Sequence, residues 1–151
     1  MKQLSYATAG KRILLVEDER ITREALNLLL LQDNHTVVEA NNGAEALTLF
    51  RAERFDLVIT DYEIPFIKGN ELAAQIKRLT PGQPILMVTA YPQVSNVDNP
   101  VDAVLNKPFV PARLREIIAE VLSRPPTNST SAETVGIDIF SPSFETEVIS
   151  A

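Results

Sequence analysis

Four short apolar runs in this chain of 151 residues each end at side chains that can take part in phosphate or metal chemistry. At these ends stand two adjacent carboxylates, a single carboxylate, a hydroxyl group and an amine, namely Glu17 with Asp18, Asp61, Thr89 and Lys107. A carboxylate nucleophile, a metal, a cation and a hydroxyl donor are together what phosphoryl transfer requires. This chemistry is available only if the chain brings the four ends to one place.

The run that ends at Asp61 is the most informative. Leu57 to Ile59 is wholly apolar, which is typical of a strand buried on both faces, and Pro65 prevents regular strand pairing from continuing. A buried parallel strand delivers the residue at its carboxyl end to the edge where open α/β sheets bind ligands. Taken alone, Asp61 could equally cap or turn the chain, which Asp often does.

Three carboxylates gathered at one sheet edge would repel one another unless a positive charge lay among them. A hard divalent cation removes this conflict, and Mg²⁺ suits a site of carboxylate, water and phosphate oxygens. Lys107 would supply a second positive charge. We therefore expect Mg²⁺ near Glu17, Asp18 and Asp61.

Hydrophobic periodicity predicts the elements that would position these side chains. Apolar runs predict five strands, at residues 12–16, 36–40, 57–59, 84–88 and 101–105. Helical spacing predicts helices at residues 20–32, around 44–50, at about 69–79 and from Pro111 to Ser123. Strand and helix alternate, which favours a parallel sheet with helices on both of its faces.

Some residues are expected to face the core, to cap a helix or to stay in solvent. The first helix has Ile21, Ala25, Leu28, Leu29 and Gln32 at helical spacing, and the third is expected to bury Leu72, Ala73, Ile76 and Leu79. Core packing explains part of the run Leu28–Leu31, and a partner-facing or dimer surface is a second interpretation. Asn42 can cap the second helix, and Glu19 suits the start of the first. His35, the only histidine, is expected to be a solvated turn residue.

The composition is that of an ordinary soluble globular protein, with 45% hydrophobic and 23% charged residues. The absence of cysteine excludes disulfides and thiolate zinc sites. The sequence has no signal peptide and no apolar run of about 20 residues that could cross a membrane, so we expect a cytoplasmic protein. It has no cluster of Lys and Arg that could follow a phosphate backbone, so we expect no nucleic-acid binding.

The order of the site motifs resembles that of a receiver domain of the two-component response regulator family. The resemblance rests on Glu17-Asp18 after a buried strand, Asp61 followed by Ile64-Pro65, Thr89-Ala90, and Lys107-Pro108-Phe109. It covers about residues 11–123. It implies a single α/β domain with a flavodoxin-like, doubly wound sheet of five parallel strands in the order 2-1-3-4-5.

The resemblance implies that Asp61 accepts a phosphoryl group from a phosphohistidine of a sensor histidine kinase or a histidine phosphotransfer protein. Lys107 would pair with the phosphoryl oxygens, and Thr89 would bond to one of them after phosphorylation. Such a protein is a signalling regulator with an unknown downstream target, and it is not an enzyme beyond intrinsic autodephosphorylation.

The resemblance also assigns ligands for Mg²⁺. Asp18 and Asp61 would bind the ion directly, and Glu17 would bind it directly or through water. The backbone carbonyl of Glu63 would complete the protein ligands.

Three features depart from the family pattern. Val104 replaces the aromatic residue that many receivers have three positions before the lysine, and Tyr91 is a candidate substitute for it. The segment Gln93–Asn99, between two prolines, has room for a short helix at most. Glu63 places a negative charge beside the expected phosphoryl group, where it would either repel an anion or order a water molecule.

The resemblance divides the chain into an N-terminal leader at residues 1–10, a receiver domain at 11–124 and an acidic, Pro/Ser/Thr-containing tail at 125–151. The tail has four acidic side chains and no Lys or Arg. It is too short for a DNA-binding output domain, which predicts a stand-alone receiver or one excised from a longer chain. The tail could bind a sheet edge or a partner, and a disordered tail is equally compatible.

Three other functions use some of the same features. A phosphatase of the haloacid dehalogenase type also uses an Asp nucleophile, but there the nucleophile precedes the acidic pair, whereas here Glu17-Asp18 comes first. A flavodoxin would need a hydroxyl- and amide-rich phosphate loop after the first strand. A receiver that binds a partner without being phosphorylated, or that forms a homodimer, stays open.

Overall fold

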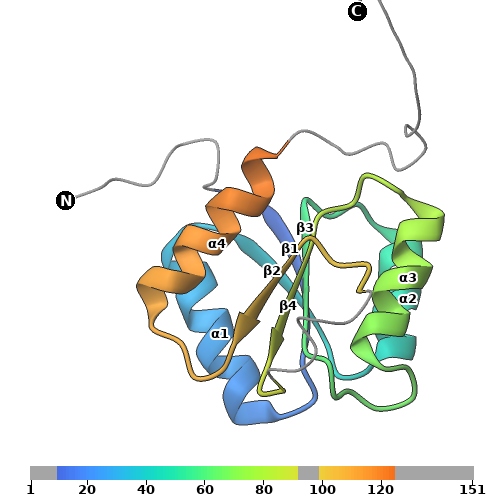
Figure 1. The fold of residues 1–151 in the computed structure, drawn as a ribbon, viewed down its shortest axis with the longest axis horizontal. Helices are drawn as coiled ribbons and strands as arrows, with labels where there is room; N and C mark the ends of the chain where they lie inside the picture. The colour runs from blue at the N-terminus through green and yellow to red at the C-terminus, as the bar shows by residue number, and fades with distance from the viewer. Residues whose placement is uncertain (1–9, 92–98, 125–151) are drawn as a thin grey trace, which may run out of the picture.

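Five parallel strands form a single sheet in the middle of the molecule (Figure 1). The computed structural model describes residues 10–91 and 99–124. Its strands are β1 (Arg12–Val16), β2 (Thr36–Ala40), β3 (Leu57–Thr60), β4 (Ile85–Thr89) and β5 (Ala103–Asn106). They lie in the order β2-β1-β3-β4-β5, and every neighbouring pair is parallel. The predicted flavodoxin-like topology is confirmed.

Helices cover both faces of this sheet. They are α1 (Arg20–Gln32), α2 (Gly43–Ala52), α3 (Gly69–Leu79) and α4 (Pro111–Ser123). Helices α1 and α4 lie on one face, and α2 and α3 lie on the other (Figure 1). Ile13 and Leu15 of β1 pack in the cluster with α1 and α4, whereas Leu14 and Val16 pack in the cluster with α2 and α3. Successive residues of the central strands thus bury opposite faces, which explains their unbroken apolar sequence.

Side chains at the helix starts behave as predicted. The Glu19 carboxylate accepts the Thr22 N–H at 2.7 Å at the start of α1, and Asn42 Oδ1 accepts the Glu45 N–H at 2.7 Å at the start of α2. Pro111 occupies the first turn of α4, where its missing N–H costs nothing. None of the helices in the described ranges is long and apolar enough to span a membrane.

Strand β5 begins two residues later than predicted. The Asp102 carboxylate accepts the backbone N–H of Ile85 at 2.7 Å and the ammonium of Lys77 at 2.9 Å. A side chain thus takes up the first backbone donor of β4, and regular pairing of β5 starts only at Ala103. The expected short helix at Gln93–Asn99, the leader and the tail fall mainly or wholly outside the described residues.

The predicted inner face of α1 is wrong except for Leu29, which is partly buried against the core. Leu26 and Leu30 are its buried residues, whereas Ile21 is 67% exposed and Leu28 is 63% exposed. Apolar residues occur on both sides of this helix, so periodicity alone could not choose between them. Leu79, predicted to be buried in α3, is 49% exposed.

His35 is buried, which contradicts its predicted place in solvent. The His35 side chain is 5% exposed, and its Nδ1 accepts the backbone N–H of Lys11 at 3.0 Å. Burial lowers the pKa of His35, and Lys11 adds to this effect, whereas Asp33 and Asp56 oppose it. The ring is therefore held neutral between the start of β1 and the start of β2.

Neutral His35 should make stability depend on pH. Because the pKa of His35 is lower in the fold than its ordinary value near 6.5, the unfolded chain binds the proton more readily. This contribution to the free energy of unfolding is complete above about pH 6.5 and is lost as the pH falls below it. We expect urea unfolding to show a larger loss of stability between about pH 7 and pH 5 for the wild type than for His35→Asn. An equal loss in both proteins would contradict this expectation.

Candidate active site

The strand register brings the predicted site residues to one edge of the sheet. Val16 pairs with Thr60, and Thr89 pairs with Asn106. Glu17, Asp61 and Lys107 each directly follow one of these strands. The side chains therefore start from neighbouring positions although they are up to 90 residues apart in the sequence.

The ammonium group of Lys107 joins the two carboxylates. Its Nζ donates to Asp61 Oδ2 at 2.9 Å and to Glu17 Oε1 at 3.1 Å. The side chains are only partly accessible, with 3% of Glu17, 11% of Asp61 and 22% of Lys107 exposed. Glu17, Asp61 and Lys107 thus form a compact ionic cluster that solvent reaches from one side.

The charges of this cluster depend on one another. Burial raises the pKa of Glu17, the neighbouring Asp61 raises it further, and Lys107 only partly offsets both effects. Burial alone would lower the pKa of Lys107, but its hydrogen bond to Asp61 and the charges of Asp61 and Glu17 outweigh this and raise it. Lys107 therefore stays protonated, and the carboxylates need a cation between them.

Asp61 is held in a fixed orientation. Its Oδ1 accepts the N–H of Tyr62 at 2.6 Å, and its backbone N–H donates to the Val16 carbonyl at 3.1 Å. The Thr60 hydroxyl donates to the Asp61 carbonyl at 2.9 Å. Each carboxylate oxygen thus has one defined donor, which aims the group at the edge of the sheet.

Thr89 is fully buried at the end of β4. Its Oγ1 accepts the N–H of Tyr91 at 3.0 Å, and its carbonyl accepts the N–H of Lys107 at 2.8 Å. The Tyr91 ring contacts the Tyr62 ring edge-on, with 6.0 Å between the ring centres. Thr89 is thereby linked to both Lys107 and the residue that follows Asp61.

The donor chemistry of this edge suits Mg²⁺, because a hard cation can replace or supplement the charge of Lys107 between Glu17 and Asp61. Asp18 is exposed next to Glu17, and Arg23 donates to the carbonyl of Glu17 at 2.9 Å, which fixes the backbone there. Across residues 10–91 and 99–124, however, no three acidic or histidine side chains are gathered as a ready metal cluster. Asp18 would have to turn toward Asp61 to complete one.

The sequence profile of the response regulator receiver domain matches residues 13–119. The chain belongs to this family. Curated relatives include the response regulator protein FleR of Pseudomonas aeruginosa, 36% identical over 115 residues that cover 72% of this chain and 24% of FleR. Another is the sensor histidine kinase AruS of the same organism, 36% identical over 134 residues that cover 83% of this chain and 13% of AruS. The chain thus spans at most about a quarter of these two proteins.

Solved receivers share the fold. The response regulator TrrA of Thermotoga maritima, determined in complex with Mg²⁺-BeF, has a TM-score of 0.71 and 34% identity, with 74% of this chain and 98% of TrrA covered. A putative response regulator from Chloroflexus aurantiacus has a TM-score of 0.71 and 30% identity, with 76% and 99% covered.

The structure shows the surroundings of the residues that depart from the family pattern, Glu63, Val104 and Tyr91. The Glu63 carboxylate is ion-paired with Lys68, whose ammonium lies 5.7 Å from the centre of the Tyr62 ring. The negative charge of Glu63 is therefore partly neutralised, and the sequence did not predict this pairing. Val104 is half-buried in β5, and Tyr91, which is 41% exposed, contacts Tyr62.

Sequence reasoning also missed Gly69. Its N–H donates to the Tyr62 carbonyl at 2.8 Å, and a Cβ at this position would lie 2.1 Å from the Asp61 carbonyl oxygen. Helix α3 therefore begins in direct contact with the backbone of Asp61 and Tyr62. A glycine at the predicted start of a helix was the available signal, because glycine is unfavourable inside a helix unless a close approach requires it.

Gly69→Ala should displace the Asp61 backbone. We expect a loss of stability of about 1–3 kcal/mol, the usual cost of overpacking. Urea unfolding would check this effect. Asn70→Ala, at the next position of α3, should cost much less, and equal losses from the two substitutions would refute the close contact.

Proposed function

We propose that this receiver takes a phosphoryl group onto Asp61 from the phosphohistidine of a sensor histidine kinase or a phosphotransfer protein, with Mg²⁺ as cofactor. The modification would change a protein-binding surface. The observation that carries this proposal is the shared ammonium of Lys107, which contacts both Asp61 and Glu17.

In the proposed reaction, a carboxylate oxygen of Asp61 bonds to phosphorus as the bond to the donor histidine nitrogen breaks. Lys107, already 2.9 Å from Asp61, would pair with the incoming phosphoryl oxygens. Mg²⁺ would supply further neutralisation of charge, held by the side chains of Glu17, Asp18 and Asp61 and the carbonyl of Glu63.

Thr89 would report the modification to the surface. Its hydroxyl oxygen accepts the N–H of Tyr91, whose ring contacts that of Tyr62. A new hydrogen bond from the Thr89 hydroxyl to a phosphoryl oxygen would therefore disturb the contact with Tyr91. We infer that the Tyr62–Tyr91 pair shifts with Thr89. It would take the part that a strand-five aromatic, replaced here by Val104, plays in many receivers.

The exposed side of α1 offers a contact for the phosphate donor. Ile21, Ala25 and Leu28 are one to two turns apart and all exposed, and the helix begins two residues after Asp18. We propose this apolar face as the docking surface for the donor protein or, alternatively, for a second receiver.

The chain would act as a regulator that is modified, and not as a turnover enzyme.

Incubation with Mg²⁺ and acetyl phosphate tests the acceptor. We expect intact mass to show one added phosphoryl group in the wild type and none in Asp61→Asn, which should stay folded because Asn keeps the size of the side chain. Asp56→Asn, an exposed carboxylate at the other end of β3, should be labelled like the wild type. Removal of Mg²⁺ by chelation should abolish labelling. Labelling that persists in Asp61→Asn would overturn the assignment, and a wild type that is never labelled would favour a binding module that works without phosphate.

The Glu63–Lys68 pair should set the lifetime of the phosphoryl group. Lys68→Ala leaves an unpaired carboxylate that can order an attacking water, so we expect faster loss of phosphate. Glu63→Ala leaves an unpaired ammonium near the phosphoryl anion, so we expect slower loss. The decay of the phosphorylated mass over time measures both, and the double substitution should lie between them. A change in the same direction for both single variants would contradict this role of the pair.

A further inference from the structure

A groove lies at the edge of the sheet opposite Asp61. One cavity of about 820 Å³ is lined by Arg12, residues 50–56, Thr80 and Gln83. An adjoining cavity of about 350 Å³ shares Phe55, Asp56, Thr80 and Gln83 with it and extends to Lys11 and Leu122. We call the two together the basal groove. It runs from the end of α2 to the end of α4.

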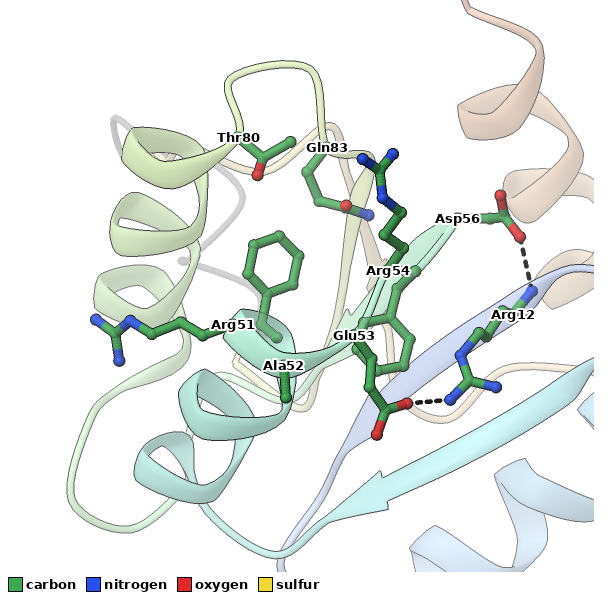
Figure 2. Close-up of a pocket in the computed structure, with 10 residues that line it drawn as sticks. Arg12, Arg51, Ala52, Glu53, Arg54, Asp56, Thr80 and Gln83 are labelled. Carbon is green, nitrogen blue, oxygen red and sulfur yellow. Dashed lines mark hydrogen bonds and ion pairs between the residues drawn. The ribbon is translucent and has the colours of Figure 1, made fainter.

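The basal groove has unpaired positive charge. Its two carboxylates are both engaged by Arg12, whose guanidinium pairs with Glu53 and whose backbone N–H donates to Asp56 at 2.8 Å (Figure 2). Arg51 and Arg54 are exposed, and among the residues that the structure describes neither has an acidic partner within salt-bridge distance. Figure 2 shows both guanidinium groups directed away from the Arg12–Glu53 pair. The groove therefore suits an acidic ligand.

Helix α4 ends at the groove. Leu122, in the last turn of α4, lines the smaller cavity, and the Arg124 guanidinium donates to the carbonyl of Asp102. The last residues that the structure describes therefore lie beside the groove. The rings of Phe50 and Phe55, stacked with centres 6.4 Å apart, line the larger cavity, and Phe55 also lines the smaller one. Each ring presents only its edge, since both residues are 8% exposed.

The sequence beyond this point has the complementary chemistry. After the linker at residues 125–132, the segment 133–149 has four acidic side chains and no basic one. Its apolar residues alternate loosely with polar ones, and they are Val135, Ile137, Ile139, Phe140, Phe144, Val148 and Ile149. We propose that residues 133–149 dock in the basal groove of their own chain, with carboxylates against Arg51 and Arg54 and apolar side chains against Phe50, Phe55 and Leu122.

The linker makes weak docking sufficient. A flexible linker of eight residues has an r.m.s. span of about 16 Å, and its extended reach is roughly 26–29 Å. The linker is therefore short. A short flexible linker gives the tethered segment an effective concentration on the order of millimolar. Docking is then populated even if the untethered segment would bind with a dissociation constant in the upper micromolar range.

A spin label can test this docking in the full chain. The sequence has no cysteine, so Ser141→Cys gives a single attachment site for a nitroxide within the proposed segment. We expect the amide NMR signals of residues 52–56 and of Thr80, Gly82 and Gln83 to lose most of their intensity when the label is active and to recover it when the label is reduced. The loss should disappear in Arg51→Glu/Arg54→Glu, and it should return when Glu145→Lys/Glu147→Lys is added.

The matched control reverses two arginines at the other edge of the sheet. Arg20→Glu/Arg113→Glu changes exposed residues at the starts of α1 and α4 and should leave the signal loss intact. No loss of signal in the full chain would overturn the proposal. In a second sample, nitroxide-labelled chains at natural isotope abundance are mixed with isotope-enriched chains that lack the nitroxide. An equal loss of signal in this mixture would also overturn the proposal, because the segment would then bind another copy.

Discussion

The placement of two carboxylates in a poorly hydrated edge of the sheet is the constraint on which the site depends. Glu17 and Asp61 are both largely buried, and burial of ionised carboxylates is costly unless a cation lies between them. Lys107 satisfies this requirement from the end of β5. Loss of the Lys107 amine would leave both carboxylates without this cation, and an unpaired buried charge of this kind typically costs about 3–5 kcal/mol.

The parallel sheet explains why this cluster can exist at all. Each residue of the cluster directly follows a strand, and the register of β1, β3, β4 and β5 sets the four strand ends side by side. The loop after β3 is tightened by Gly69, whose backbone lies against that of Asp61 and Tyr62. Rigid strand ends and a short, closely packed loop give Asp61 a single orientation, which is what a group transfer requires.

The two edges of the sheet differ in charge. The edge at Asp61 gathers two carboxylates around one ammonium, so its charge favours cations. The opposite edge has four basic side chains lining the basal groove, with its two acidic ones engaged by Arg12. The basic groove and the acidic cluster therefore lie at opposite edges of the sheet, so they need not compete for ligands.

The sequence by itself determined the order of elements and which charged side chains follow the strands. Runs such as Leu57–Ile59 are short, wholly apolar and bounded by turn residues, so they predict buried parallel strands, and the topology rules then bring Glu17, Asp61 and Lys107 together. Only the tertiary structure decided which face of α1 is buried, because Leu26 and Leu28 are equally apolar and packing alone distinguishes them. The tertiary structure also decided the burial of His35 and the lining of the basal groove, through contacts between segments distant in sequence. It decided the Glu63–Lys68 pair through side-chain directions that no local pattern records.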